Sequence, residues 1–226
     1  MIFLNYLAFS ILNLATIKWA SKNDLIMQFI FTRGLFASTS LLIGSRVLKI
    51  PVSFLQLKAS QLRILFGGGG LALSFLGGYH LNSALYATLQ RSDLPLLYMY
   101  ERKKLKKSGF LLISILFIIC IFFEFYIGVT LCGATLLTMS RVYQKKSIST
   151  EPPFLLPFAP AISLLMIGAM GICLQNIQFK ISIPGVLSAF VMIAAYWISA
   201  PIIKKKGVFV ICLMDVIAGI LVALLL

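Results

Sequence analysis

Charged residues are scarce in this 226-residue chain, and acids are the scarcest of them. Charged residues make up 12% of the sequence, and only six residues are Asp or Glu, whereas a soluble domain carries roughly 25% charged residues. The mean hydropathy is +1.01, so the chain has too little polar surface to face water on all sides. The composition excludes an ordinary soluble domain and predicts an integral protein of a lipid bilayer.

Metal-binding and catalytic patterns are also missing. His80 is the sole histidine, and the four cysteines lie inside apolar runs without forming a C-x-x-C pair. These patterns predict buried thiols, no metal site and no cofactor. The Asp-rich pattern of membrane phosphotransferases is absent, and no nucleophile has an identifiable partner base. We therefore expect no enzymatic activity.

Apolar runs near the length of one membrane crossing divide most of the chain. A spanning helix needs about 20 apolar residues. The segment 81–100 is long enough to cross but contains polar residues, and its crossing would bring the total to nine spans in an all-α bundle. The other predicted spans are residues 2–19, 25–43, 62–80, 109–123, 126–143, 154–174, 183–203 and 208–226.

Positive charges test this division. The formal net charge is +14, but the basic residues occur in short clusters between apolar runs, which indicates loops beside anionic lipid rather than a nucleic-acid surface. With nine spans and the N-terminus inside, fifteen of the twenty Lys and Arg residues fall on the inner side and four on the outer side. This asymmetry predicts a cytoplasmic N-terminus and a crossing by residues 81–100.

Two charged residues lie deep inside predicted spans. Arg33 is near the middle of the second span, and Asp215 lies about eight residues into the last one. Intramembrane charges are costly and usually face a bundle interior or a water-filled cavity. Arg33 is therefore a candidate to bind a carboxylate, a phosphate or a π-system. A structural pair with Asp215, or an arginine that extends to the interface, is the alternative.

Further candidates form a polar cluster after the third span. Tyr79, His80 and Asn82 belong to it, as do Gln90, Arg91 and Asp93 at its far end. His80 suits proton coupling near neutral pH, and an interfacial position is equally compatible with the sequence. Tyr196 and Trp197 of the eighth span are candidates to line a cavity, or to serve in packing or interfacial anchoring. The candidate substrate-binding residues are Arg33, Tyr79, His80, Asn82, Trp197 and Asp215.

Small residues mark one face of the third span. Gly70, Ser74 and Gly78 recur every four residues, which predicts close packing against another helix. Flexibility of a moving helix is the alternative.

Several short motifs occur in an order that resembles the EamA-type drug/metabolite transporter superfamily. The resemblance covers most of the chain and implies two inverted helical repeats, residues 1–123 and 124–226, and transport of a small-molecule substrate. The motifs are Arg33 in the second span, Ser83-Ala84-Leu85-Tyr86, Asp93-Leu94-Pro95, Tyr100-Glu101-Arg102 with Gly109, and the segments beginning at Tyr126 and Arg141.

The chain departs from that family plan in two places. The fourth span is shortened, and a tenth helix is missing from the sequence. Three explanations stay open: a shortened member, a degenerate member, or a member completed as a homodimer. We expect a secondary transporter of a small metabolite in the bacterial inner membrane, working by alternating access. A non-transporting or degenerate membrane scaffold protein of the same family is the alternative.

Overall fold

The computed structural model is all-helical in the residues it describes, which are 2–23, 25–52, 58–81, 83–90, 92, 124–147, 152–206 and 208–225. The predicted span 109–123, the basic cluster near residue 101 and much of 81–100 lie outside these residues. The elements are α1 (Ile2–Asn23), α2 (Ile26–Val47), α3 (Lys58–His80), α4 (Ser83–Gln90), α7 (Phe125–Ser147), the 3₁₀ turn η2 (Pro153–Leu155), α8 (Phe158–Leu174), α9 (Ile183–Lys206) and α10 (Val208–Leu225).

Six of these helices are long and apolar enough to cross a membrane: α1, α2, α3, α7, the segment from η2 through α8, and α9. α10 contributes a shorter apolar stretch, Leu213–Val222. The corresponding predicted spans differ from the observed helices by only a few residues at each end. α4, in the ambiguous segment 81–100, is a helix of eight residues. The described residues thus form an all-helical protein whose six long apolar helices indicate a polytopic membrane protein, whereas nine crossings stay a prediction.

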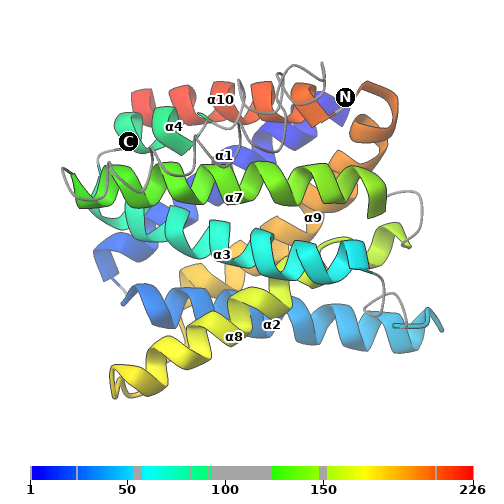
Figure 1. The fold of residues 1–226 in the computed structure, drawn as a ribbon, viewed down its shortest axis with the longest axis horizontal. Helices are drawn as coiled ribbons and strands as arrows, with labels where there is room; N and C mark the ends of the chain where they lie inside the picture. The colour runs from blue at the N-terminus through cyan, green and yellow to red at the C-terminus, as the bar shows by residue number, and fades with distance from the viewer. Residues whose placement is uncertain are drawn as a thin grey trace.

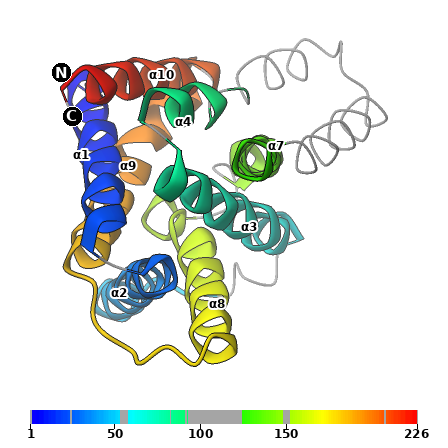
Figure 2. The same ribbon diagram turned by 90° about the vertical axis from the view of Figure 1, so that its left-hand side faces the viewer.

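The long helices form an antiparallel bundle. α1, α3, α8 and α10 run in one direction, and α2, α7 and α9 run in the other (Figure 1). The main pairings are α1 with α9, α2 with α8 and α9, and α3 with α7 and α8. α4 packs beside α10 and α7 (Figure 2). The start of α1 therefore lies at the same end of the bundle as the ends of α2, α7 and α9 and the starts of α3, α8 and α10, and we name this end the basic end (Figure 1).

Glycine allows two of these pairs to approach closely. In the α3–α7 pair, Gly70 and Gly133 face each other, and a Cβ on either would lie 2.9 Å from the other's carbonyl oxygen. In the α2–α8 pair, a Cβ on Gly168 would lie 2.5 Å from the Cα of Phe31. Small residues commonly permit such backbone contacts in lipid. The small face predicted for the third span is therefore a packing face at Gly70, while Gly78 lies against the ring of Tyr86.

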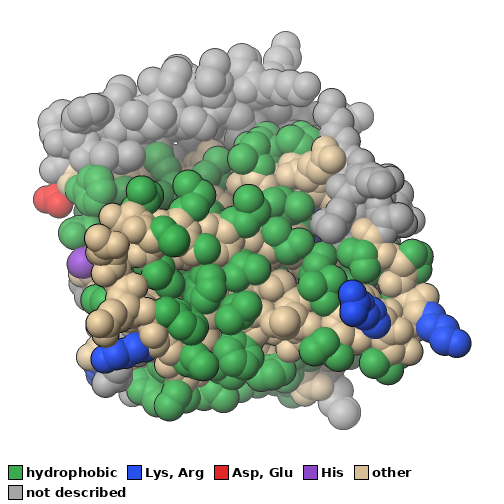
Figure 3. Space-filling view, turned by 90° about the horizontal axis from the view of Figure 1, so that it is seen from below, with side chains coloured by type: hydrophobic (Ala, Val, Ile, Leu, Met, Phe, Trp, Pro, Cys, Tyr) green, Lys and Arg blue, Asp and Glu red, His purple; other side chains and the backbone are tan. Residues whose placement is uncertain are grey.

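Large apolar side chains cover much of the exterior. Leu174, Leu224 and Val47 are more than 70% exposed. The face seen from below is mostly apolar across its middle, with charged side chains at its edges (Figure 3). Such a surface is unfavourable in water and suits contact with lipid tails.

Candidate functional site

A cavity of about 140 Å³ lies between the early and the late helices of the chain. Residues of the early helices α1, α2, α3 and α4 and of the late helices α7, α9 and α10 together line it. Its polar lining residues are Tyr6, Ser10, Asn13, Arg33, Gln90, Ser140, Arg141, Gln144, Tyr196, Ser199 and Asp215. Two cations and one carboxylate are thus the charged groups among the described residues of its wall.

Arg33 is held in the wall by contacts from three other helices. Its side chain is 2% exposed, and its Nη1 donates to Asn13 Oδ1 at 2.9 Å and to Ser188 Oγ at 2.6 Å. The guanidinium carbon lies 4.8 Å from the ring centroid of Phe75. These hydrogen bonds and the cation–π contact orient the group. Among the described residues, none accepts a hydrogen bond from the buried Nε.

The start of α9 brings Ser188 to Arg33. Ser182 precedes the helix, and its Oγ accepts a hydrogen bond from Gly185 N at 3.1 Å, as a helix cap does. The backbone N–H of Ser182 donates to Thr32 Oγ1 at 3.2 Å. Since Thr32 precedes Arg33, this contact fixes α9 against α2 at the level of the guanidinium. Ser188, nearly two turns further along α9, then reaches Arg33.

Asp215 lies in a second polar group of the same cavity. Its Oδ1 accepts hydrogen bonds from Tyr6 Oη at 2.9 Å and from Ser10 Oγ at 2.5 Å. Its Oδ2 faces Arg141 Nη2 at 3.4 Å. The carboxylate is therefore held by α1 and α7, although α10 carries it. The sequence-based pairing of Arg33 with Asp215 is wrong, because Arg141 is the cation next to the acid.

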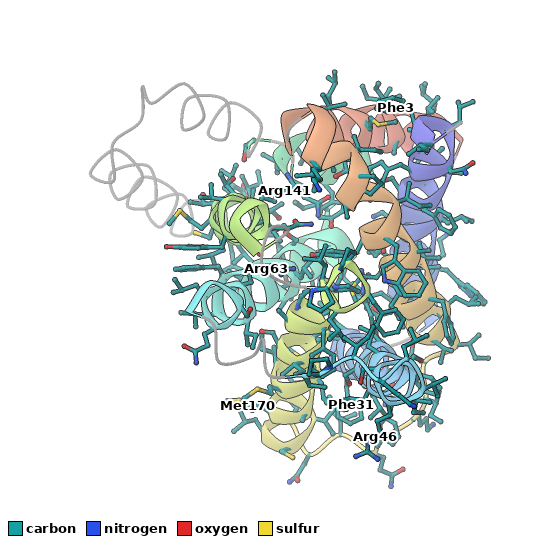
Figure 4. All side chains as sticks on the ribbon, turned by 90° about the vertical axis from the view of Figure 1, so that its right-hand side faces the viewer. Phe3, Phe31, Arg46, Arg63, Arg141 and Met170 are labelled. Atoms are coloured by element: carbon teal, nitrogen blue, oxygen red, sulfur yellow. The ribbon has the colours of Figure 1, made fainter. Side chains whose placement is uncertain are left out.

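Arg141 is the site residue that the sequence assigned differently. The sequence analysis counted Arg141 among the inner-side positive charges at the very end of the predicted span 126–143, but α7 continues to Ser147 and Arg141 lies well inside that helix. In the view with the basic end facing the reader, its side chain points from α7 toward α9 and α10 (Figure 4). Its inward direction makes it part of the cavity wall rather than of the basic loop.

The other predicted site residues lie elsewhere. Tyr79 packs its ring 6.2 Å from that of Phe29, at the end of the bundle opposite the basic end. His80 is exposed and stacks on Tyr126 with ring centroids 4.0 Å apart. Trp197 is 42% exposed, and its Nε1 donates to the carbonyl oxygen of Phe154 at 3.1 Å. Asn82 lies outside the described residues. The structure thus brings Arg33 and Asp215 into one cavity and places Tyr79, His80 and Trp197 outside it.

Sequence reasoning also missed the neutral polar residues of the site. Asn13 and Ser10 of α1, and Ser188 of α9, occur in apolar runs as single polar residues. Ser and Asn are common enough in membrane helices that one of them carries little information. Their spacing was the available signal, because Tyr6, Ser10 and Asn13 follow one another at intervals of four and three, which places them on one helix face.

The two halves of the bundle differ in packing. The cavity takes its α1 and α10 residues from the first part of each helix, and its α7 and α9 residues from the later part, so most of its lining lies in the half next to the basic end; Arg33 comes from the first part of α2, beyond the middle of the bundle. The opposite half contains buried side chains such as Ile17, Phe29 and Phe75. The rings of Phe29 and Phe75 meet edge to face at 5.3 Å. In the described residues, an aromatic and aliphatic core therefore lies between the cavity and the opposite end.

Comparisons of the chain with protein families, with curated proteins and with solved structures find no match.

Proposed function

We propose that this protein is a secondary transporter that carries a small metabolite across a cytoplasmic membrane by alternating access. The observation that carries the proposal is the cavity between the early and late helices, with a buried arginine and a buried aspartate in its wall. Intramembrane charges beside a cavity are typical of substrate and ion pathways. Transporters built from inverted repeats bind their substrates at the interface between the repeats, near the middle of the bilayer.

The helix pairings support an inverted repeat. If α1, α2, α3 and α4 are exchanged with α7, α8, α9 and α10 in that order, the main pairings map onto one another. The pair α1–α9 exchanges with α3–α7, α2–α9 with α3–α8, and α1–α10 with α4–α7, while α2–α8 and α4–α10 map onto themselves. α1, α2 and α3 also run opposite to α7, α8 and α9 (Figure 1). This is the pattern that a two-fold axis in the membrane plane would produce.

The arrangement of charge supports an orientation. The last turn of α2 carries Arg46, Lys49 follows that helix, and the end of α9 carries Lys204, all at the basic end. The positive-inside rule would place this end in the cytoplasm, as does the fifteen-to-four division of the sequence. In this orientation most of the cavity lining lies in the cytoplasmic half, and the Phe29–Phe75 core lies between the cavity and the outside. On this proposal the state would be inward-facing.

Flux into proteoliposomes tests the proposal. Purified protein would be reconstituted and offered labelled metabolites of three charge classes, namely amines, neutral solutes and carboxylates, with protein-free vesicles as the baseline. We expect saturable uptake of members of one class and a strong reduction of that uptake in the Arg33→Gln variant. The His80→Ala variant is the matched control, since His80 is exposed and outside the cavity.

Two results would contradict the proposal or its binding site. If folded, reconstituted protein gave no uptake or exchange above the baseline for any class, transport would be refuted and a non-transporting scaffold would be favoured. If uptake occurred but Arg33→Gln transported as well as the unmodified chain, the cavity would not be the binding site.

A further inference from the structure

We infer that the cavity binds a small monocarboxylate, with the carboxylate group on Arg33 and Asn13. The inference rests on the proposed transport function and names its substrate class. It follows from the donors that the Arg33 network leaves available, from the charge balance of the cavity wall and from the cavity volume.

The first step is the count of donors on Arg33. A guanidinium has five N–H groups, two on each Nη and one on Nε. Asn13 and Ser188 accept from Nη1. In the described part of the chain, Nε and Nη2 have no acceptor. A buried N–H without a partner is costly, and a planar carboxylate matches two adjacent guanidinium donors.

The orientation of the Asn13 amide adds a second donor. Asn13 Oδ1 accepts from Arg33 Nη1 and, at 3.3 Å, from Ser188 Oγ. Because the oxygen is engaged by these two donors, the Nδ2 group of the amide is the part left to face other partners. Asn13 lines the cavity, so its N–H groups are available to a ligand beside Arg33. Arg33 and Asn13 therefore both offer donors, which favours an anionic acceptor.

The charge balance selects a monoanion. Arg141 lies 3.4 Å from Asp215, and Tyr6 and Ser10 also donate to this carboxylate. Among the described residues that line the cavity, Arg33 is thus the charge without a counter-ion. One carboxylate would neutralise it. A ligand ammonium group would have to compete with Arg141 for Asp215, and a second carboxylate would meet the negative charge of Asp215.

The volume and the apolar lining limit the rest of the ligand. A cavity of about 140 Å³ is close to the roughly 150 Å³ of a cavity that holds benzene, so the ligand has only a handful of non-hydrogen atoms. Phe9, Leu71 and Met192 supply apolar surface beside the polar residues. A short acid with an apolar chain fits both features.

Direct binding to the purified full chain in detergent tests the inference without any transport assay. The probes are butyrate, butylamine, 4-aminobutyrate and succinate, which present a monoanion, a cation, a zwitterion and a dianion on chains of the same length. Thermal shift and calorimetry would be measured at constant ionic strength, with sodium chloride as the control. We expect butyrate to bind at least about tenfold more tightly than each of the other three, and chloride to produce no shift.

Two variants separate binding from folding. Arg33→Gln should lose butyrate binding. Asn13→Asp keeps the shape of the side chain and the hydrogen bond from Arg33, while it supplies the missing counter-ion, so it should fold and also lose butyrate binding. Four results would each overturn the inference. The first two are retained butyrate affinity in Asn13→Asp and equal binding of the amine or the zwitterion. The other two are an equal shift by chloride and no butyrate binding by folded protein. Binding without flux would leave it intact and refute transport. Flux of another solute class without butyrate binding would refute the inference and leave the proposed transport intact.

Discussion

The substitution Gly168→Ala tests the packing that positions Arg33. Gly168 of α8 faces the backbone of α2 at Phe31, two residues before Arg33, and an added Cβ would lie 2.5 Å from the nitrogen and the Cα of Phe31. An ordinary contact begins at 3.4 Å, so the two helices would have to separate by roughly 1 Å. α2 cannot retreat easily, because a Cβ on Gly185 of α9 would already lie 3.0 Å from Thr32 on its other side.

The size of the effect follows from two opposing contributions. Replacing Gly by Ala inside a helix gains about 1 kcal/mol from backbone conformational preference, whereas overpacking costs about 1–3 kcal/mol. Gly69→Ala is the matched control, since its Cβ would meet only Leu136 Cδ1 at 3.6 Å. The helix preference cancels between the two variants. Gly168→Ala should therefore be about 1–3 kcal/mol less stable than Gly69→Ala.

Thermal unfolding in one detergent at one heating rate measures the difference. At about 2–4 °C per kcal/mol for a chain of this size, the apparent Tm of Gly168→Ala should lie several degrees below that of Gly69→Ala. Equal melting temperatures, or a higher one for Gly168→Ala, would show that α2 and α8 are not in backbone contact at Phe31. The placement of the Arg33 guanidinium would then lose its support.

Three further predictions concern the charged residues. Asp215→Asn should lower the apparent Tm because Arg141 loses its counter-ion. In a double-mutant cycle, adding Arg141→Met should recover part of this loss, whereas additive losses would contradict the ion pair. His80→Ala should leave butyrate affinity unchanged within about twofold in calorimetry, since His80 contacts Tyr126 outside the cavity, and a tenfold loss would place the site elsewhere. In a chain without its native cysteines, Lys180→Cys should react with an impermeant maleimide added to intact cells, and Lys49→Cys only after permeabilisation; the reverse pattern would invert the proposed orientation.

The helices were the part of the fold most accessible from the sequence. Hydropathy over about 20 residues reports directly on the free energy of burial in lipid, and it located the long helices to within a few residues. Their ends were harder to predict. α3 begins at Lys58 rather than Leu62, and α7 continues to Ser147, because basic side chains tolerate a helical backbone where the helix leaves the bilayer.

The helix pairings and the cavity were not accessible in the same way. Every spanning helix is apolar around most of its circumference, so hydropathy does not tell which face meets a neighbour. Glycine gave a partial signal at Gly70, which does pack against α7. It did not reveal that Gly168 and Gly34 bring α8 and α2 together beside Arg33.

The depth of each charge in the membrane could nevertheless have identified the partner of Asp215. Asp215 is seven residues beyond the start of α10, about 10 Å from the basic end at 1.5 Å per residue. Arg141 is six residues before the end of α7, about 9 Å from the same end. Arg33 is seven residues beyond the start of α2, at the opposite end, which leaves it about 20 Å from the basic end.

A buried acid pairs most readily with a cation at its own depth, because helices that cross a membrane offer little freedom to slide. Depth therefore favours Arg141 as the partner of Asp215 and leaves Arg33 to neutral hydrogen-bond partners. The sequence contained this information once the orientation of the spans was predicted. A cation near the end of a span is expected to face the loop, and Arg141 does not. Arg141 turns inward because Asp215 is within its reach, and that reorientation leaves Arg33 as the charge that a ligand can neutralise.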